Sequence, residues 1–486
     1  MASSKECSPL APATRETTGS AVIEHLAILG GSGDLTGRYL LPALARLAEH
    51  RLLPPGFRVT GLARSDWDDE AFRGWAADWL ERQAGDIAAQ ARTWLCGRLS
   101  YRQAEADEVA VLHALLAADQ EPVAAYLALP PAAFGPAVDA LGAAGLAPGS
   151  CVVVEKPFGG DLASAQDLNA RLHRSFREEH VFRVDHFLGL QAVQNVLALR
   201  FANRIFEPLW SAEHVRRVEI RFDETLGLEG RAGYYDTAGA LRDMVQNHLL
   251  QVLCLVAMER PTMREADDLR DRKVDVLHAV RRLSRDEIVT GSVRGRYTAG
   301  DVGGRRLPAY TDEPGVDPSR ETETFAELTL WIDNPRWSGV PFVLRTGKAL
   351  DADLQCVDLE FAPVPLSGFG ASSTPPPNRL RMRIDPERIA LRAVVTGAGG
   401  PFDLDEIEFD ADLAPAELPP YGRVLLDVLG GDRTLSIRAD EAEEAWRIVE
   451  PVLDAWHRGA VPLREYPAGS FGPDRGNSRS RRPGPA

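Results

Sequence analysis

Lysine is nearly absent from this sequence of 486 residues, although the chain carries many other cations. Only four of the 55 Lys and Arg residues are lysine, so the other 51 (55 − 4) are arginine. The four lysines are Lys5, Lys156, Lys273 and Lys348. Because almost every cation in the chain is an arginine, a lysine that falls inside a motif is a candidate for a specific role, one that needs a compact ammonium group.

The chain also lacks an excess of positive charge. Its 71 Asp and Glu residues outnumber the 55 Lys and Arg residues, and the formal net charge is −16. Nucleic acids and membrane surfaces are polyanions that attract basic protein faces. We therefore expect neither as a partner, and we expect a few well-placed cations to hold any anionic ligand.

Cysteine and long apolar runs are scarce as well. The five cysteines are scattered without CxxC spacing, which disfavours a disulfide framework and a zinc site and favours a reducing cytoplasm. The uncharged run Pro122–Val138 contains internal prolines and cannot cross a bilayer as a helix. The first 20 residues lack the apolar core of a signal peptide. These features predict a soluble cytoplasmic protein without a bound metal.

The length of the chain and the pattern of its apolar residues predict two domains between two tails. At ~150 residues per domain, this length predicts two or three domains. Residues 21–189 alternate short apolar runs with helical patterns, which predicts a Rossmann-like α/β domain of parallel βαβ units. Residues 190–466 show longer alternating segments, which predict an α+β domain with a large, mainly antiparallel sheet. Residues 1–20 and 467–486 are predicted to be disordered tails.

Individual elements can be placed within both domains. The first domain is expected to contain strands at His25–Leu29, Phe57–Leu62, Ala124–Leu129 and Cys151–Glu155, with helices such as Arg38–Glu49 and Glu70–Gln83. In the second domain we expect strands at Val215–Phe222, Glu323–Ile332 and Val357–Phe361, a helix from Leu241 to Met258, and a long loop from Gly300 to Ser319.

The first expected strand runs into a glycine-rich turn that suits a dinucleotide. The turn comprises Gly30, Gly31, Ser32, Gly33, Asp34 and Leu35. Glycines let the backbone approach a pyrophosphate, and the N-terminus of the following helix supplies unpaired N–H groups and a positive dipole. Because the spacing is not a strict GxGxxG, a tight βα turn without a ligand is an equal alternative.

The end of the second strand indicates which dinucleotide would bind. NAD-binding folds place an acid there for the ribose hydroxyls, whereas this chain places Arg64 there, a cation suited to a 2′-phosphate. Arg64 therefore predicts NADP as the cofactor. Asp66 leaves NAD possible, and an ordinary surface arginine is the alternative interpretation of Arg64.

Two segments after the nucleotide motifs carry candidate catalytic residues. Lys156 follows a strand, and open α/β sheets bind their ligands at the carboxyl ends of strands. A compact ammonium fits there, where a broad guanidinium would clash with a cofactor or a sugar. Asp185 and His186 are adjacent, and an extended backbone would point their side chains to opposite faces and give them different roles.

A third segment places His248 on the apolar face of the helix that begins at Leu241. Such a histidine is most often a satisfied core residue, yet a partly buried histidine beside a carboxylate also suits a general base near neutral pH. Asp243 lies ~140° around an α-helix from His248, so both would reach one ligand only across the first turn. Lys348 follows a glycine at the end of RTGK, in a second expected ligand loop.

These motifs, in this order, resemble the glucose-6-phosphate dehydrogenase family. The resemblance is carried by GGSGDL, YLALPP, EKPFG, VDHFLG, VQNVLALRFANRIFEPLW, EGRAGYYDTAGALRDMVQNHLLQ, EPGVDP, IDNPRWSGVPFVLRTGK and YPAGSFGP, which begin at Gly30 and end at Pro473. It implies NADP-dependent oxidation of glucose 6-phosphate at C1 to 6-phosphogluconolactone, the first step of the oxidative pentose phosphate pathway. It also implies a homodimer or homotetramer joined through the large sheet.

The resemblance further implies a role for each candidate residue. His248 would be the base that removes the C1 hydroxyl proton, and Asp185 would orient it and stabilise its charged form. Lys156 would touch both cofactor and substrate. The remaining candidates are Glu224 and Asp243, which would hold sugar hydroxyls, and His186 and Lys348, which would bind near the phosphate.

Some positions depart from the family pattern. After HFLG the family usually has a phosphate-binding lysine, and this chain has Leu190; beyond Lys348, where the family has another basic residue, it has Asp353. Tyr39 stands where many members carry a lysine near the cofactor. A charge-assisted hydrogen bond is worth ~1.5–3 kcal/mol, so losing one cation weakens phosphate binding about tenfold to hundredfold.

These departures support a second hypothesis beside glucose 6-phosphate oxidation. In it, the chain oxidises an unphosphorylated or amino-bearing sugar by the same chemistry. A third hypothesis, less favoured, is a non-catalytic relative that binds nucleotide or sugar and regulates a partner. Asp185, His248 and Lys156 together argue against the third hypothesis, because a binding protein has no use for an acid–base set.

Overall fold

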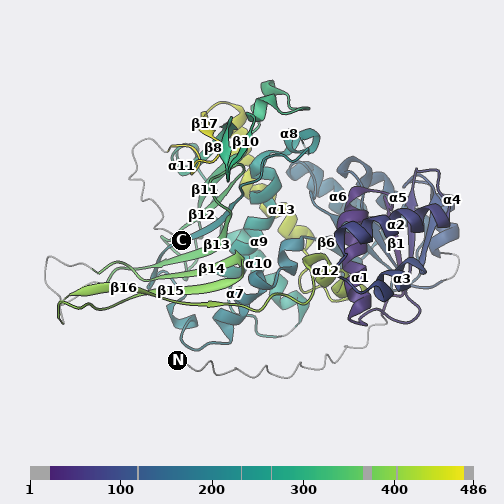
Figure 1. The fold of residues 1–486 in the computed structure, drawn as a ribbon, viewed down its shortest axis with the longest axis horizontal. Coiled ribbons are helices and arrows are strands. Elements are labelled where there is room, and N and C mark those ends of the chain that lie inside the picture. The colour runs from purple at the N-terminus through teal and green to yellow at the C-terminus, as the bar shows by residue number, and fades with distance from the viewer. Residues whose placement is uncertain are drawn as a thin grey trace.

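The structure is a computed structural model that describes residues 22–117, 120–230, 232–263, 265–364, 375–400 and 403–474. The predicted tail at residues 1–20 lies outside these ranges. Figure 1 shows a helix-rich domain built from the first part of the chain beside a larger domain with a long sheet. Within the described ranges, no helix is long and apolar enough to cross a lipid bilayer.

The first domain is built on a parallel sheet of six strands in the order β3-β2-β1-β4-β5-β6. Its strands are β1 (His25–Leu29), β2 (Arg58–Ala63), β3 (Leu99–Gln103), β4 (Val123–Leu127), β5 (Cys151–Glu155) and β6 (Val181–Val184). From β1 the chain adds β2 and β3 on one side and then β4, β5 and β6 on the other, so the direction in which strands are added reverses between β1 and β4. Open α/β sheets bind ligands at such a point, in the crevice at the carboxyl ends of the strands.

Helices cover both faces of this sheet because successive residues of a strand point to opposite sides. Leu26 and Ile28 of β1 pack in one apolar cluster, and Ala27 and Leu29 pack in another. The first face carries η1 (Thr36–Leu40), α1 (Leu41–Glu49), α2 (Asp69–Gln83) and α3 (Ala89–Cys96), and the second carries α4 (Val109–Leu112), η2 (His113–Ala117), η3 (Pro131–Ala133), α5 (Phe134–Ala144) and α6 (Leu162–Ser175). The Rossmann-like prediction is confirmed.

The second domain contains a nine-stranded sheet in the order β16-β15-β14-β13-β7-β12-β11-β8-β17. Its strands are β7 (Val215–Asp223), β8 (Ser292–Thr298), β11 (Phe325–Trp331), β12 (Pro341–Gly347), β13 (Leu354–Phe361), β14 (Arg379–Asp385), β15 (Arg388–Thr396), β16 (Leu404–Asp412) and β17 (Leu463–Pro467). Neighbours are antiparallel except for β7 with β12 and β8 with β17, which confirms the mainly antiparallel prediction.

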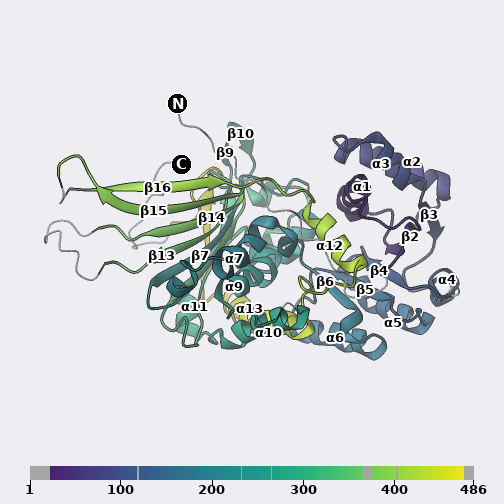
Figure 2. The same ribbon diagram turned by 90° about the horizontal axis from the view of Figure 1, so that it is seen from below.

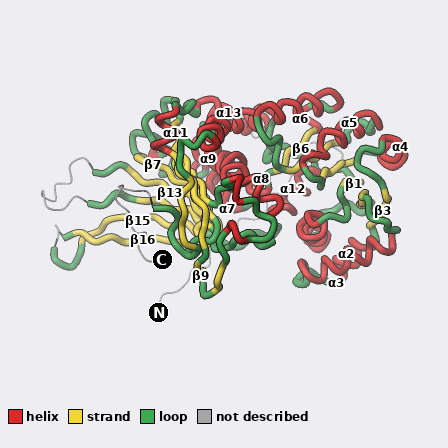
Figure 3. Tube along the Cα trace, turned by 90° about the horizontal axis from the view of Figure 1, so that it is seen from above, coloured by secondary structure: helices red, strands yellow, loops and turns green. Residues whose placement is uncertain are grey.

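Helices lie between the nine-stranded sheet and the first domain, as α7, α9 and α13 show in Figure 2. Figure 3 shows the same helices gathered beside the strands. The remaining helices of the described chain are η4 (Glu178–His180), η5 (His186–Gly189), α7 (Gln191–Phe201), η6 (Glu207–Leu209), α8 (Ala232–Ala240), η7 (Leu241–Leu249), α9 (Leu250–Ala257), α10 (Ala266–Ala279), α11 (Arg285–Gly291), η8 (Tyr310–Asp312), η9 (Pro318–Arg320), α12 (Pro420–Leu429) and α13 (Ala439–His457).

Helix α12 belongs to the second domain by sequence but packs on the first. Its residues Leu425 and Val428 lie in the apolar cluster that contains α1. The backbone N–H of Ile23 donates to the carbonyl of Leu429 at 2.9 Å. The domain boundary at residue 190 stays a prediction, and α12 ties a late segment of the chain to the first sheet.

Two element predictions need correction. The helix expected from Leu241 begins with the π-helical η7 of nine residues and becomes α-helical only at Leu250. The loop expected at Gly300–Ser319 contains a hairpin of β9 (Gly300–Val302) and β10 (Arg305–Leu307). Gly303 and Gly304 make this hairpin possible, because both have positive φ, 56° and 84°, as a tight hairpin turn requires.

The C-terminal tail prediction is also wrong for its first residues. The structure describes the chain as far as residue 474, and residues 475–486 lie outside it. Gly469 donates its N–H to the carbonyl of Ala349 at 2.8 Å, and Nη2 of Arg345 donates to the carbonyl of Phe471 at 2.8 Å. These hydrogen bonds hold the segment after β17, whose Gly- and Pro-rich composition carried no sign of them.

Candidate functional site

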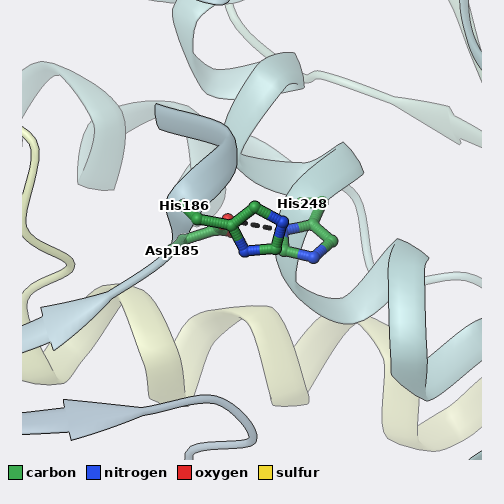
Figure 4. Close-up of side chains that lie close together, drawn as sticks. All are labelled: Asp185, His186 and His248. Carbon is green, nitrogen blue, oxygen red and sulfur yellow. Dashed lines mark hydrogen bonds and ion pairs between the residues drawn. The ribbon is translucent and has the colours of Figure 1, made fainter. Parts of the chain in front are cut away.

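A buried carboxylate–imidazole pair lies where the two domains meet. Asp185 follows β6 and His248 lies on η7, and both are 1% exposed. Oδ1 of Asp185 is hydrogen-bonded to Nδ1 of His248, as Figure 4 shows. The N–H of Phe187 donates to the same carboxylate oxygen at 3.0 Å. With the ring proton on Nδ1, Nε2 of His248 is the nitrogen free to accept a proton.

Burial and mutual attraction set the charges of this pair. Burial lowers the pKa of His248 below its ordinary value of 6.5, and Asp185 opposes that decrease. Burial raises the pKa of Asp185, but the attraction and hydrogen bond of His248 outweigh it, and the pKa of Asp185 falls to about 2. Near neutral pH the carboxylate is therefore ionised and the imidazole neutral, which is the state a general base needs.

Lys156 brings an ammonium group to Nε2 of His248. Its Nζ lies 2.6 Å from Nε2 of His248 and 3.0 Å from the backbone carbonyl oxygen of Asp243. It also lies 3.4 Å from the Asp243 carboxylate. Lys156 stands directly after β5, at the carboxyl end of the parallel sheet. The ammonium is therefore in direct hydrogen-bond contact with Nε2, and a hydroxyl that accepts from Lys156 and donates its proton to His248 has to displace this contact.

The π-helical geometry of η7 explains why one ammonium reaches both Asp243 and His248. In an α-helix, residues five apart lie ~140° apart around the axis. In a π-helix the hydrogen bonds run from residue i to i+5, so residues five apart stand one turn above the other. The prediction that both residues reach one ligand only across the first turn assumed an α-helix, and the ~140° separation behind it is wrong for η7.

His186 lies beside the pair and not on the opposite face. The chain leaves extended geometry after Asp185 and enters the 3₁₀ turn η5, which changes the direction of the His186 side chain. The centre of the His186 ring lies 4.9 Å from the centre of the His248 ring. The His186 ring also stacks on the ring of Tyr421, with the two centres 5.4 Å apart. Burial, and then the charge of His248, lower the pKa of His186 to about 3, so this ring is neutral near pH 7.

Asp185, His186 and His248 also offer ligand atoms within 4.8 Å of one another, as a metal centre would require. The hydrogen bond between Asp185 and His248 already joins two of the three side chains. The ring of Phe187 stacks on His248 at 3.8 Å and covers one face of the imidazole. These contacts suit a proton-transfer pair, and we interpret the cluster in that sense.

Three further candidates gather at the ends of β7 and β12. Nζ of Lys348 donates to Oε2 of Glu224 at 2.8 Å. Oδ1 of Asp353 accepts the N–H of Thr225 at 2.7 Å and its hydroxyl at 3.1 Å. Asp353 thus holds the turn that follows Glu224, and the charge of Lys348 is already paired with a carboxylate.

The glycine turn lies at the carboxyl end of β1, beside the ends of β2 and β4. A Cβ at Gly30, whose φ is +90°, would lie 2.1 Å from the carbonyl oxygen of Ala128, and a Cβ at Gly31 would lie 2.6 Å from Cα of Gly61. The helical backbone begins at Asp34, within the motif and before the predicted start at Arg38. The helix N-terminus therefore faces the turn, which is the arrangement that binds a pyrophosphate.

Arg64 follows β2 and its side chain is exposed. The hydroxyls of Ser32 and Ser65 lie 3.0 Å apart, so the glycine turn and the Arg64 segment are in contact. In the part of the chain that the structure describes, Arg64 forms no ion pair. A guanidinium in this position is free to bind a phosphate on the adenosine ribose.

Sequence reasoning missed three side chains of the site. Phe187 stacks on His248, Tyr421 stacks on His186, and Glu155 accepts a hydrogen bond from Tyr126 beneath them. Burial raises the pKa of Glu155 to about 7. Phe187 stands within VDHFLG and Glu155 within EKPFG, so the motifs carried a signal for both. Tyr421 had no such signal, because it reaches the site from α12.

Two family profiles match the chain almost end to end. The profile of the glucose-6-phosphate dehydrogenase NAD binding domain matches residues 27–195, and that of the glucose-6-phosphate dehydrogenase C-terminal domain matches residues 197–484.

Individual proteins with these names are similar to the chain over nearly its whole length. The glucose-6-phosphate 1-dehydrogenase of Gluconobacter oxydans is 43% identical over 462 residues, which cover 92% of this chain and 94% of the relative. That of Mycolicibacterium smegmatis is 40% identical over 463 residues, 92% of this chain and 93% of the relative.

Solved structures agree with this likeness. The crystal structure of the Mycobacterium avium enzyme of that name has a TM-score of 0.83 at 37% identity and covers 93% of this chain and 96% of its own. A structure of glucose-6-phosphate dehydrogenase in complex with its substrate glucose-6-phosphate has a TM-score of 0.83 at 32% identity, covering 94% and 96%.

Proposed function

The chain belongs to the glucose-6-phosphate dehydrogenase family, and from this we propose that it oxidises the C1 hydroxyl of glucose 6-phosphate to 6-phosphogluconolactone. We propose NADP as the hydride acceptor. The observation that carries the proposal is the buried Asp185–His248 pair, whose unprotonated Nε2 accepts a hydrogen bond from the Lys156 ammonium at 2.6 Å. The relatives named above, and the substrate complex among the solved structures, support glucose 6-phosphate as the substrate.

In this mechanism the neutral His248 accepts the proton of the C1 hydroxyl while the C1 hydrogen leaves as hydride. Asp185 holds the ring by its Nδ1 and stabilises the imidazolium that forms. Lys156 donates a hydrogen bond to the same hydroxyl oxygen and orients it. A nicotinamide cofactor held by the glycine turn would supply the hydride acceptor, so the products would be the lactone, the reduced cofactor and one proton on His248.

We propose sugar-binding roles for the other candidates. Asp243 and Glu224, both beside a lysine ammonium, accept hydrogen bonds from ring hydroxyls. His186 and Lys348 bind toward the phosphate end. His186 acts there as a neutral hydrogen-bond donor, since burial lowers its pKa to about 3.

Replacement of His248 by Asn tests the catalytic proposal. Loss of a general base lowers the rate by about 10²–10⁴-fold, so kcat should fall by that factor while cofactor affinity stays near the native value. The same replacement at His278, whose side chain is 58% exposed on α10, is the matched control and should leave kcat unchanged. Absence of any turnover in the native chain would instead favour the non-catalytic regulatory relative.

Replacement of Arg64 by Ala tests the cofactor proposal. The exposed Arg64 and the glycine turn support NADP, because a guanidinium can bind the 2′-phosphate that NAD lacks. Losing this charge-assisted bond should raise the KM for NADP about tenfold to hundredfold and leave that for NAD nearly unchanged. Arg174→Ala, at a side chain that is 64% exposed on α6, is the control. An equal loss for both cofactors would argue against a 2′-phosphate site at Arg64.

We also propose that the chain acts as a homodimer or homotetramer in the cytoplasm, joined through the nine-stranded sheet. Phe409 on the edge strand β16 is 59% exposed and supports association on this side. Cys151, Cys254 and Cys356 are free buried thiols, which supports a reducing compartment. Light scattering of the purified chain tests the assembly, and a mass of one chain at micromolar concentration would contradict it.

A further inference from the structure

A cavity of about 320 Å³ lies beside the first residues of η7. Its walls come from the junction of α8 and η7, from β8, from the segment between η9 and β11, and from the end of α13. None of the proposed catalytic, sugar-binding or cofactor-binding residues lines it. Small-molecule sites begin at about 300 Å³, so this cavity suits a small ligand and is too small for a dinucleotide.

Three arginines line the cavity from three different elements. Arg242 is the second residue of η7, Arg294 lies in β8, and Arg320 is the last residue of η9. A guanidinium group presents a planar fork of donors that matches the oxygens of a phosphate or a carboxylate. Three such groups around one small volume favour an anion with several acceptor oxygens and more than one negative charge.

The contacts of two of these arginines are long. Within the described residues Arg242 forms no ion pair, and its Nη1 lies 3.4 Å from the carbonyl oxygen of Ala238. Arg320 lies 3.5 Å from the carboxylate of Asp236 and 3.6 Å from that of Asp317. Charge-assisted hydrogen bonds from nitrogen to oxygen are about 2.7–2.9 Å long. Both guanidinium groups can therefore form shorter bonds to a ligand.

The third arginine is paired with a carboxylate that a ligand can displace. Nη2 of the buried Arg294 lies 3.3 Å from Oε2 of Glu321, whose side chain is 62% exposed. An ion pair with an exposed partner contributes little to stability. An incoming anion can therefore take the place of the Glu321 carboxylate on Arg294.

The other two carboxylates of the cavity are held by the protein. Asp236 accepts hydrogen bonds from the hydroxyl of Tyr310 at 2.7 Å and from the N–H of Asp317 at 3.0 Å. Glu323 accepts the N–H of Leu241 at 3.0 Å. Once Glu321 has moved out, three guanidinium groups face these two carboxylates, and the cavity has an excess of positive charge.

A histidine in the cavity wall responds to the same charges. Burial lowers the pKa of His457 below 6.5, and the charges of Arg242 and Arg294 lower it further. Asp454 raises the pKa of His457, with a smaller effect. The ring is therefore repelled by cations more than it is attracted by carboxylates, which agrees with a site for an anion.

The cavity adjoins the helix that carries the proposed catalytic residues. Arg242 directly precedes Asp243, whose backbone and side-chain oxygens contact Lys156. Glu323 holds the start of the same helix through the N–H of Leu241. An anion that binds Arg242 therefore acts on the first turn of η7, and through it on the contact between Asp243 and Lys156.

We propose that this cavity binds a small phosphorylated anion and that the bound anion changes the catalytic rate through η7. The inference goes beyond the proposed function, because it adds an effector site apart from those of substrate and cofactor. Phosphate is the favoured chemistry because its oxygens accept bonds from several guanidinium groups at once. Inorganic phosphates and small organic phosphates share this chemistry.

Isothermal titration calorimetry of the full chain with saturating NADP tests the binding. The probes are inorganic pyrophosphate, inorganic phosphate and glycerol 3-phosphate, and the one that binds most tightly shows which source of phosphate the cavity prefers. Arg242→Gln should raise the Kd for pyrophosphate about tenfold to hundredfold, because a charge-assisted hydrogen bond is lost. Arg174→Gln, at a side chain that is 64% exposed on α6, is the matched control and should leave the Kd unchanged.

Glu321→Gln should have the opposite effect on binding. It removes the carboxylate that competes for Arg294, so the Kd for pyrophosphate should fall by up to about fivefold. Glu213→Gln removes the same charge at a side chain that is 82% exposed and outside the cavity, and it should not change the Kd. Circular dichroism shows whether each variant is folded.

Initial rates at saturating glucose 6-phosphate and NADP test the effect on catalysis. We expect pyrophosphate to change kcat of the native chain about twofold or more, because the anion and the catalytic residues act on the same helix. The change should disappear in Arg320→Gln, which replaces a cavity arginine on η9 that is 48% exposed.

The possible results separate the inference from the proposed function. An equal Kd for pyrophosphate in the native chain and in folded Arg242→Gln overturns the inference. So does an unchanged kcat, or an effect that is only competitive with glucose 6-phosphate, since the anion would then lie in the substrate site. If the chain oxidises no glucose 6-phosphate, the proposed function fails, and calorimetry still decides whether the cavity binds the anion.

Discussion

At the scale of single residues, the charge of the His248 ring decides at which pH it can serve as the base that we propose. Burial lowers the pKa of His248 below 6.5, so the ring stays neutral at a lower pH than an exposed imidazole does. Protonation below that pKa removes the base. We therefore expect kcat/KM to be level near pH 7 and to fall about tenfold per pH unit only below about pH 6.5. Initial rates between about pH 5 and about pH 9 measure this profile.

Asp185→Asn gives the matched comparison for this pH profile. It removes the carboxylate that opposes the decrease in the His248 pKa, so the acid limb should move to still lower pH. Since Asn does not hold the ring proton on Nδ1 as a carboxylate does, kcat should fall roughly 10²–10⁴-fold. An acid limb centred above pH 6.5 in the native chain would count against His248 as the base.

At the scale of elements, the βα turn after β1 depends on the close approach of the Gly30 backbone to the backbone carbonyl of Ala128. Gly30→Ala would place a Cβ 2.1 Å from the Ala128 carbonyl at a φ of +90°, so the turn has to move. We expect a loss of more than about 1 kcal/mol in the free energy of unfolding and a weaker affinity for NADP. Urea denaturation and cofactor titration measure the two effects.

Gly74→Ala in α2 is the control for this turn. A Cβ at Gly74 meets no atom within 4 Å, and Ala is preferred to Gly inside a helix by ~0.5–1 kcal/mol, so this variant should be slightly more stable. Native cofactor affinity in a folded Gly30→Ala variant would contradict the role given to the turn.

At the scale of the whole molecule, Glu155 joins the carboxyl end of β5 to the late helix α12. Tyr126 donates to its buried carboxyl group, and Tyr421 of α12 adds a second hydrogen bond. Tyr421 in turn stacks on Tyr39 at 5.4 Å and on His186. This cluster connects segments from the start, the middle and the end of the described chain, so its charge bears on the stability of the whole fold.

The pH dependence of stability should reveal this cluster. Burial raises the pKa of Glu155 from 4.5 to about 7, so its contribution is fully present below pH 4.5 and is lost as the pH rises through 7. Glu155→Gln keeps a neutral side chain at all pH values. We expect it to exceed the native chain in free energy of unfolding above pH 7, by up to about 3 kcal/mol, with the gap closing toward pH 5. Urea denaturation at several pH values measures the gap.

Glu213→Gln, at a side chain that is 82% exposed, is the control for Glu155 and should show no such gap. If the difference in free energy of unfolding between Glu155→Gln and the native chain stays constant with pH, folding does not shift the pKa of the Glu155 carboxyl group.

By itself, the sequence determined the local elements and the candidate catalytic residues. β1 and β5 begin and end where predicted, because a short continuous apolar run and a following turn are properties of a few adjacent residues. Lys156, Asp185 and His248 were singled out by their motifs. The structure brings these three side chains into direct contact.

Only the tertiary structure decided which of these residues meet and in what environment. It brought the Lys156 ammonium to both Asp243 and His248, and it set Tyr421 against His186. The physical reason is that helix type, burial and pKa depend on neighbours far away in the chain. Local propensity contains no information on such contacts, so the packing of the two domains decided them.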